Sequence, residues 1–374
     1  MSTEVLADDQ ALRVARRRRV LDAMEVDDLD ALLLGREANA RYVAGAQRLW
    51  TAGTRPFGPG CVLVRATGGI HLVSTWDEGI PEDIPHNHLF GITWNPGNLL
   101  AWLKGIEGLE GARRVGTDSL TPRFAQWLAK ILPSAELVDA EPALQGARRI
   151  KTPEELGAIR SSIGVAQDAL AAARSEIAPG VSERHLAAVF MEAMARRGVT
   201  TPATQRVAWI SSATHRHHQH ATSAAGDEDL VAIDAGVVAA GYTGEVGRTW
   251  PASPASAGSA IKDLYLQAEE LWSRLLGACR PGASCRELLS AYATAGHAPP
   301  PFPIANGLGL GFDTPVVTGQ LPSTAEHERL DPGMVLALTA YVVGEDGRAV
   351  FRKEAVHVAA SGPEVLTSAP CWEG

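Results

Sequence analysis

The segment from Asp229 to Trp250 constrains the fold of this chain more than any other. Asp234 ends the apolar run Leu230-Val-Ala-Ile, which predicts a buried β-strand. A second strand is predicted from Gly241 to Trp250, and it carries Glu245 eleven residues after Asp234. These two acid-bearing strands are the starting point for predicting both the fold and the function.

The composition is that of an ordinary globular protein of 374 residues, 45% hydrophobic and 21% charged, long enough for two domains. A net charge of −9 argues against nucleic acid as a partner. No apolar run approaches the roughly 20 residues that span a membrane, and the first residues lack the apolar stretch of a signal peptide. Four scattered cysteines have no metal-ligand spacing, so we expect a cytoplasmic protein.

The chain predicts two domains with a boundary near residue 147, namely residues 1–147 and 148–374. Strand and helix signals alternate in the first, which predicts an α/β domain. The second begins with a strong helix start, in which Thr152 is the N-cap, Pro153 the first helical residue and Glu155 completes a capping box. Helices are predicted at 11–25, 122–132, 153–176, 183–197 and 258–277, and strands at 30–34, 60–64, 69–73, 114–118, 207–211, 230–234, 241–250, 334–343 and 349–358.

Five further segments, together with 229–250, carry a family resemblance in the right order and spacing: 28–34, 39–45, 149–155, 177–183 and 361–367. On these motifs the chain is identified as a member of the pita-bread-fold family of creatinases, prolidases, Xaa-Pro aminopeptidases and methionine aminopeptidases. The resemblance implies an α/β (α+β) protein with an N-terminal creatinase-like α/β domain and a C-terminal pita-bread domain. It also implies a homodimer.

The resemblance also marks the positions of metal ligands, because the family's metallopeptidases hold two divalent ions with two Asp, one His and two Glu. Asp234 matches the first Asp and Glu245 replaces the second. Asn306 stands at the His position and Thr339 at the first Glu position. Glu354 matches the last Glu in the phrase Arg352-Lys353-Glu354-Ala355.

This altered ligand set predicts a site without metal, since neutral Asn and Thr bind divalent ions weakly. Three converging carboxylates, Asp234, Glu245 and Glu354, would repel one another and would need a cation, a proton or a hydrogen-bonding ligand. A cationic substrate group would satisfy them. Creatinase-like members of the family hydrolyse a C–N bond without metal and are the precedent.

A histidine-rich segment, Thr214-His-Arg-His-His-Gln-His220, supplies the candidate general base. The resemblance places His217 at the position of the family's acid–base histidine, with His218 and His220 as close rivals, and an imidazole can take and return a proton near neutral pH. A solvated polar loop is the alternative interpretation. Another is that one of these histidines rebuilds a site for a single Mn²⁺ or Zn²⁺.

Two arginines complete the candidate site. Arg55 lies in the segment that reaches the partner's active site in dimeric relatives and could clamp a substrate carboxylate; Arg352 is a further candidate for substrate binding. For Arg248 we expect a neighbouring carboxylate as partner.

These observations favour a metal-independent hydrolase of a C–N bond in a small amidino, guanidino, cyclic amide or modified amino-acid substrate, with no cofactor. In this hypothesis His217 activates water, Glu245 and Glu354 with Asp234 bind the nitrogen side, and Asn306, Thr339 and His220 contact the substrate. The alternatives are an Xaa-Pro-type metallopeptidase with an altered metal site and a non-catalytic binding protein on a retired peptidase fold.

Overall fold

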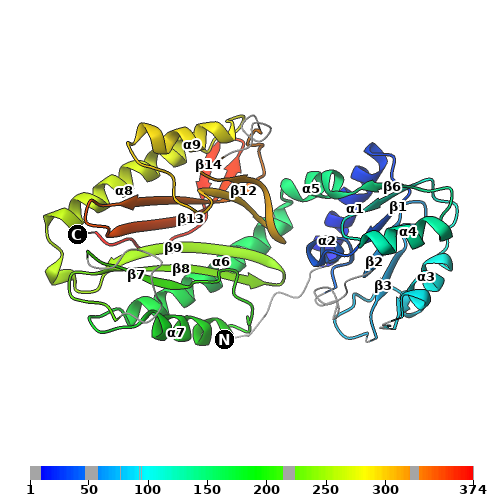
Figure 1. Ribbon diagram of the computed structural model, residues 1–374, viewed down its shortest axis with the longest axis horizontal. Helices are drawn as coiled ribbons and strands as arrows, with labels where there is room; N and C mark the ends of the chain where they lie inside the picture. Colours follow the sequence, from blue (N-terminus) through cyan, green and yellow to red (C-terminus); the bar gives the residue numbers. More distant parts are fainter. Residues whose placement is uncertain are drawn as a thin grey trace. The chain divides into compact units, whose positions relative to one another are not determined.

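The structure is a computed structural model that describes residues 10–46, 58–75, 77–91, 93, 95–213, 224–320 and 328–373. The chain divides into two compact units, one that ends at Arg148 and one that begins at Arg149. Figure 1 labels their α-helices and many of their strands. Each unit is built on its own mixed or antiparallel sheet covered by helices, and this confirms the predicted α/β fold class.

The N-terminal unit contains a six-stranded sheet in the order β4-β3-β2-β1-β5-β6. The central strand β1 is antiparallel to β2 and parallel to β5, so the sheet is mixed. All four β1 residues are buried, as their continuous apolar run predicts. The elements are α1 (Gln10–Val26), β1 (Ala31–Leu34), α2 (Glu37–Ala44), β2 (Cys61–Val64), β3 (Ile70–Val73), η1 (His86–His88), β4 (Leu89–Phe90), α3 (Pro96–Lys104), β5 (Arg114–Thr117), α4 (Pro122–Ile131), β6 (Glu136–Asp139) and α5 (Glu141–Arg149).

The C-terminal unit contains an eight-stranded sheet in the order β11-β10-β12-β13-β9-β8-β7, with β14 paired to β13. Long antiparallel pairings join β8 to β9 and β12 to β13. The elements are α6 (Pro153–Ser175), α7 (Glu183–Arg196), β7 (Ala208–Ser211), β8 (Leu230–Ala239), β9 (Tyr242–Pro251), η2 (Pro254–Ser256), α8 (Ser259–Ala278), α9 (Cys285–Thr294), β10 (Ala305–Gly309), β11 (Gly311–Val317), β12 (Val335–Val343), β13 (Ala349–Ala359) and β14 (Gly362–Val365).

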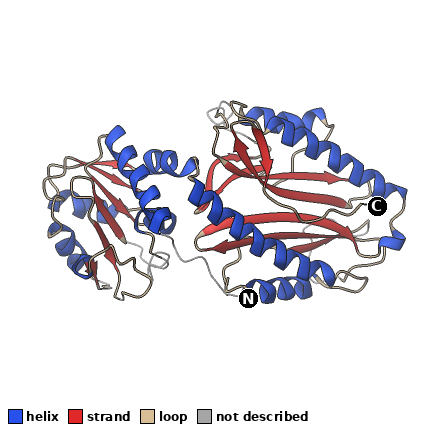
Figure 2. Cartoon of the chain, turned by 180° about the vertical axis from the view of Figure 1, so that it is seen from behind, coloured by secondary structure: helices blue, strands red, loops and turns tan. Residues whose placement is uncertain are grey.

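The helices of this unit cover one face of the sheet in two groups. Helix α6 packs on β8 and β9, and α7 packs against α6. Helix α8 packs on β12 and β13, and α9 packs against α8. Figure 2 shows the two long helices, α6 and α8, lying along the strands. Each group has its own apolar core: Val231, Ile233 and Val246 face α6 and α7, whereas Leu338 and Val356 face α8 and α9. The opposite face of the sheet is therefore free to carry a site.

The start of α6 follows from its sequence. The Thr152 side chain accepts a hydrogen bond from Glu155 N, and the Glu155 side chain accepts one from Thr152 N, so the predicted capping box is confirmed. Farther along, α6 approaches β9 closely at Gly244, where a Cβ atom would lie 2.4 Å from the backbone of Ser162. This contact fixes the strand residue next to Glu245.

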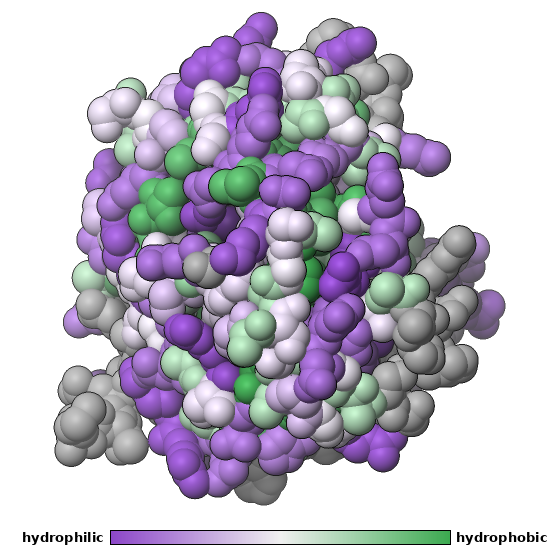
Figure 3. All heavy atoms as spheres, turned by 90° about the vertical axis from the view of Figure 1, so that its left-hand side faces the viewer, coloured by the Kyte–Doolittle hydropathy of each residue, from purple (hydrophilic) through white to green (hydrophobic). Residues whose placement is uncertain are grey.

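The surface view of Figure 3 shows one face of the molecule that is mostly hydrophilic, with hydrophobic side chains gathered in small patches. Among the helices that the structure describes, none is both long and apolar enough to cross a membrane.

Candidate functional site

One row of residues runs straight across the C-terminal sheet and brings distant parts of the chain together. Asp234 of β8 pairs with Gly247 of β9, Gly247 pairs with Lys353 of β13, and Lys353 pairs with Thr339 of β12. Directly paired residues project to the same side of a sheet. Asp234, Lys353 and Thr339 therefore share the face that the helices do not cover, which we call the site face.

Two further side chains belong to the site face by the alternation of strand residues. Glu245 lies two positions before Gly247 on β9, and Asn306 of β10 pairs with Ala337, two positions before Thr339. The strand registers thus place Asp234, Glu245, Asn306 and Thr339 on one face of the sheet.

The ammonium group of Lys353 occupies the space between the two acids. Lys353 Nζ lies 2.8 Å from each carboxylate oxygen of Asp234, and 3.3 Å from Glu245 Oε2. Gly247 makes this reach possible, because a Cβ atom at that position would lie 2.2 Å from the Phe351 ring and 3.0 Å from Lys353 Cβ. An internal cation therefore sits beside both acids.

Burial and charge set the protonation of this cluster. Burial raises the pKa of Asp234 to about 6; the positive charge of Lys353 opposes this rise and the negative charge of Glu245 adds to it. Burial alone would lower the pKa of Lys353, but the charges of Asp234 and Glu245 outweigh burial and hold that pKa above its usual value. The lysine is therefore a fixed positive charge, and Asp234 titrates near neutral pH.

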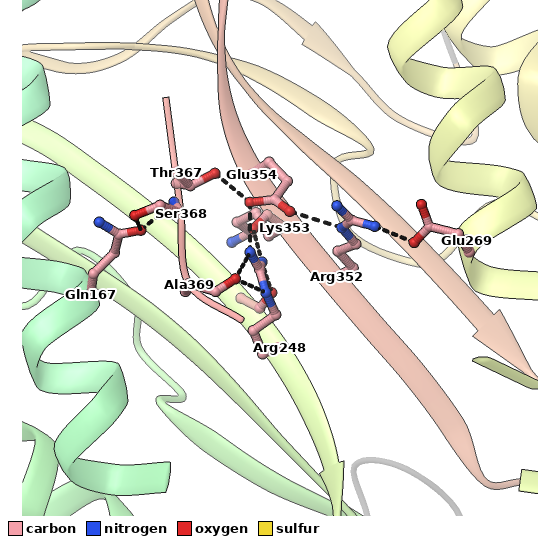
Figure 4. Close-up of polar contacts among 10 residues, drawn as sticks. Gln167, Arg248, Glu269, Arg352, Lys353, Glu354, Thr367, Ser368 and Ala369 are labelled. Carbon is pink, nitrogen blue, oxygen red and sulfur yellow. Dashed lines mark hydrogen bonds and ion pairs between the residues drawn. The ribbon is translucent and has the colours of Figure 1, made fainter. Parts of the chain in front are cut away.

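Glu354 lies on the other face of β13, which corrects the prediction that it converges with Asp234 and Glu245. Strand alternation directs it away from Lys353 and toward α8. Glu354 Oε2 accepts a hydrogen bond from Arg248 Nη2 at 2.9 Å, and Oε1 accepts one from Arg352 Nε at 2.8 Å (Figure 4). The expected carboxylate partner of Arg248 is confirmed, and it is Glu354.

Arg352 belongs to the same outer network and not to the site face. It forms an ion pair with Glu269 of α8, and its guanidinium lies 4.6 Å from the centre of the Trp272 ring. The outer network also holds the C-terminal segment, since Thr367 donates to Glu354 and Arg248 donates two hydrogen bonds to Ala369 O (Figure 4). Its role is to fix β13 and this segment.

Glu245 Oε2 accepts no hydrogen bond within the described part of the chain, although it pairs with Lys353 Nζ at 3.3 Å. The neutral groups Asn306 Nδ2 and Thr339 Oγ1 on the site face also have no hydrogen-bond partner there. Their residues are 6% and 1% exposed. A buried donor or acceptor without a partner is expensive, at about 1–3 kcal/mol. These two groups are therefore candidates to bind a ligand.

Aromatic side chains flank the charged cluster. Trp209 and Tyr341 join Phe351 in a buried cluster with Phe302 packed against it. The Trp209 ring lies edge-on to the Phe351 ring at 4.8 Å, and Lys353 Nζ lies 5.6 Å from the centre of the Phe351 ring. The site face thus combines a charged cluster, two polar groups and an apolar wall.

Three predicted site residues lie outside the described residues, namely His217, His220 and Arg55. Their roles stay predictions.

The described residues of the site face do not fit the pair of divalent ions that the family resemblance implies. Two anionic ligands, Asp234 and Glu245, remain, and the ammonium of Lys353 lies against both of them. Divalent ions need several anionic or imidazole ligands and are repelled by a fixed cation. No group of three or more metal-ligating side chains occurs among the residues that the structure describes.

Comparisons with known proteins identify the scaffold. Residues 16–150 match the Creatinase/Prolidase N-terminal domain, and residues 157–360, more than half of the chain, match Metallopeptidase family M24. The chain belongs to metallopeptidase family M24. Its altered ligand positions are thus a departure within an M24 scaffold.

Curated relatives in this family are hydrolases of C–N bonds. The creatinase of a Bacillus species is 25% identical over 386 residues, which cover 95% of this chain and 90% of the relative. The Xaa-Pro dipeptidase of Pyrococcus horikoshii is 24% identical over 281 residues, covering 72% of this chain and 73% of the relative. The predicted family and hydrolase class are confirmed.

Solved structures show the same fold. The prolidase from Pyrococcus horikoshii OT3 superposes with a TM-score of 0.75 at 21% identity, over 95% of this chain and 99% of that one. The predicted creatinase-like and pita-bread domains are therefore confirmed as the architecture of this M24 chain.

Sequence reasoning missed Lys353. It lies on β13 between Phe351 and Ala355, which are both buried. The family motif assigns the acidic ligand position to the adjacent Glu354 instead. Strand alternation was the available signal, since residues next to each other on β13 must project to opposite faces.

Proposed function

We propose that this M24 chain is a metal-independent hydrolase that cleaves a C–N bond in a small substrate. The observation that carries the proposal is the position of Lys353 Nζ, 2.8 Å from both oxygens of Asp234 and 3.3 Å from Glu245. A permanent ammonium at that point supplies positive charge where the metallopeptidases of the family hold metal ions.

The chemistry that this cluster supports is electrostatic. When water attacks the carbon of a C–N bond, negative charge develops on the attacked group, and a fixed cation in a water-poor site stabilises that charge. Lys353 is such a cation, and Asp234 and Glu245 orient it. Asp234 also titrates near neutral pH, which suits a group that exchanges a proton with substrate.

Proton transfer to and from water is assigned to His217. It takes a proton from the attacking water and delivers one to the leaving nitrogen, so that water is added across the broken C–N bond. His220 is a second substrate contact, and Arg55 is a clamp for a substrate carboxylate.

The hydrogen-bonding groups of Asn306 and Thr339 favour the uncharged members of the proposed substrate class. Lys353 pairs with both Asp234 and Glu245 and balances one of their two charges, so the site face needs a guanidinium or amidinium ion less than two free carboxylates would. The free Asn306 Nδ2 donates to a carbonyl oxygen, and Thr339 Oγ1 can accept from an amide N–H. Cyclic amides and modified amino acids are therefore favoured over guanidino compounds.

The proposal includes a cytoplasmic homodimer that acts on a small molecule. All four cysteines are free, and three of them are buried, which suits a reducing compartment.

The test is hydrolysis of a panel of small cyclic amides and guanidino compounds by protein purified without an affinity tag, before and after treatment with EDTA. We expect release of the ring-opened product or amine from at least one cyclic amide, at a rate that EDTA leaves unchanged. His217→Ala should lower that rate by about 10²–10⁴-fold. His185→Ala, at an exposed position of α7, is the matched control and should not.

A rate that appears only with added Mn²⁺ or Zn²⁺, above all on an Xaa-Pro dipeptide, would instead establish a metallopeptidase. Full turnover by His217→Ala would remove the general-base assignment.

A further inference from the structure

A pocket of about 420 Å³ lies on the helix-covered side of the C-terminal unit, away from the site face. Its walls come from α8, from β13 next to the outer network, and from Cys371 and Trp372 near the end of the chain. This volume is typical of pockets that bind small molecules. None of the roles assigned above uses the pocket.

One wall of the pocket is apolar and aromatic. Tyr265 and Trp372 contact each other with ring centres 4.6 Å apart, and Leu266 completes the wall on α8. Leu266 is 69% exposed, the second-largest exposure among the large hydrophobic side chains of the described residues. An apolar group bound against this wall would cover surface that now faces water.

The other wall carries charged side chains of both signs. Arg248, Lys262 and Arg352 lie there together with Glu269 and Glu373. Arg248 is held by Glu354 and by Ala369 O, and its side chain is 3% exposed. Arg352 is 18% exposed and pairs with Glu269 and Glu354. Lys262, one helical turn before Leu266, forms no ion pair within the described residues. An anionic group at the mouth of the pocket would therefore meet the ammonium of Lys262 and the exposed edge of Arg352.

We propose that this pocket is a second binding site, for a small amphipathic anion: a carboxylate or sulfonate that carries an aromatic or branched apolar group. The apolar group packs on Leu266, Tyr265 and Trp372. The anionic group pairs with Lys262 and with the outer edge of Arg352. The site is distinct from the site face, because β13 separates Arg352 from the side chain of Lys353.

The probe for the test is 1-anilinonaphthalene-8-sulfonate, an aromatic anion whose fluorescence rises in apolar surroundings. Titration should show one site per chain. The uncharged N-phenyl-1-naphthylamine, which has a similar ring system without the sulfonate, should bind at least about tenfold more weakly because it lacks the charge-assisted contacts. Equal affinity for the two probes would overturn the assignment of an anion site.

Three variants locate the binding. Leu266→Asp and Lys262→Glu alter exposed side chains on α8 and should each weaken binding of the sulfonate probe by about tenfold or more. Lys104→Glu makes the same charge change at an exposed lysine of α3 and should leave affinity unchanged. Thr339→Val on the site face should also leave it unchanged. If Leu266→Asp and Lys262→Glu bind as wild type does, the proposed pocket is wrong.

Cys371 gives an independent readout of position. It lines the pocket and is partly exposed, whereas Cys61, Cys279 and Cys285 are buried. Saturating probe should slow alkylation of Cys371 by iodoacetamide, measured on the Cys371 peptide by mass spectrometry. An unchanged rate at saturation would place the probe elsewhere and overturn the proposal.

Discussion

The two faces of β13 carry the same kinds of charge in opposite proportions. On the outer face one carboxylate, Glu354, receives hydrogen bonds from two guanidinium groups and one hydroxyl. On the site face one ammonium group, that of Lys353, forms ion pairs with two carboxylates, those of Asp234 and Glu245. Both oxygens of Glu354 in the outer network accept hydrogen bonds, and Arg352 links strand to helix through Glu269. The site face has an excess of acid and, within the described residues, two neutral groups without a hydrogen-bond partner, on Asn306 and Thr339.

This difference teaches how the same strand can serve stability and function at once. A saturated network of buried charges holds a single geometry. A buried cluster with unused hydrogen-bonding groups lowers the stability of the fold. Such a loss of stability is expected at a site where a ligand completes the hydrogen bonding. We therefore propose the site face for chemistry and the outer face for support.

Removing the shared cation should have the largest effect. Lys353→Met leaves Asp234 and Glu245 buried without a cation, so we expect a loss of about 3–5 kcal/mol in the free energy of unfolding at neutral pH. Urea denaturation measures it. Lys262→Met, at an exposed lysine, should stay within about 0.5 kcal/mol of wild type. A loss below about 1 kcal/mol in Lys353→Met would mean that the cation does not hold the cluster together.

The pH dependence of stability should report Asp234. Its pKa is about 6 in the folded chain and 3.8 is its ordinary value. Between these values the folded state binds more protons than the unfolded state, so the free energy of unfolding falls as pH rises from about 4 to about 6. The expected fall is on the order of 1–3 kcal/mol relative to Asp234→Asn, which cannot titrate. Parallel pH profiles for the two proteins would contradict this assignment.

Substitutions at two buried threonines should show how stability depends on whether a hydroxyl is hydrogen-bonded. These are the smallest effects that we predict. Thr249 Oγ1 donates to Phe351 O and accepts from Phe351 N, so Thr249→Val should cost about 1–3 kcal/mol. Thr339 Oγ1 has no partner within the described residues, so Thr339→Val should be neutral or stabilising in the absence of ligand. Equal losses of stability in the two variants, measured by thermal denaturation, would show that Thr339 Oγ1 already has a hydrogen-bond partner.

Much of the scaffold could be predicted because its signals are local. The capping box of Thr152 and Glu155 and the apolar run Leu230–Ile233 depend on neighbouring residues alone. The sequence did not predict helices α2, α3, α5 and α9 or strands β4, β6, β10, β11 and β14. Helix α2 has eight residues, and glycines occupy two of the five β10 positions, so neither carries a strong periodic pattern.

The candidate site could be predicted only in part, because its partners come from strands far apart in the sequence. The family spacing identified Asp234 and Glu245, but which acid or base faces them depends on the register of β13 against β9. A shift of one residue exchanges Lys353 for Glu354 and reverses the charge of the site. For this reason the sequence alone predicts Glu354, and not Lys353, beside Asp234 and Glu245.

The central claim is that the Lys353 ammonium stands where related enzymes hold metal ions. The most direct test is elemental mass spectrometry of protein purified without a tag, incubated with Mn²⁺ or Zn²⁺ and passed through a desalting column. We predict no stoichiometric metal in wild type. One or more tightly bound ions per chain would contradict the claim and would mean that residues beyond the described site face complete a metal centre.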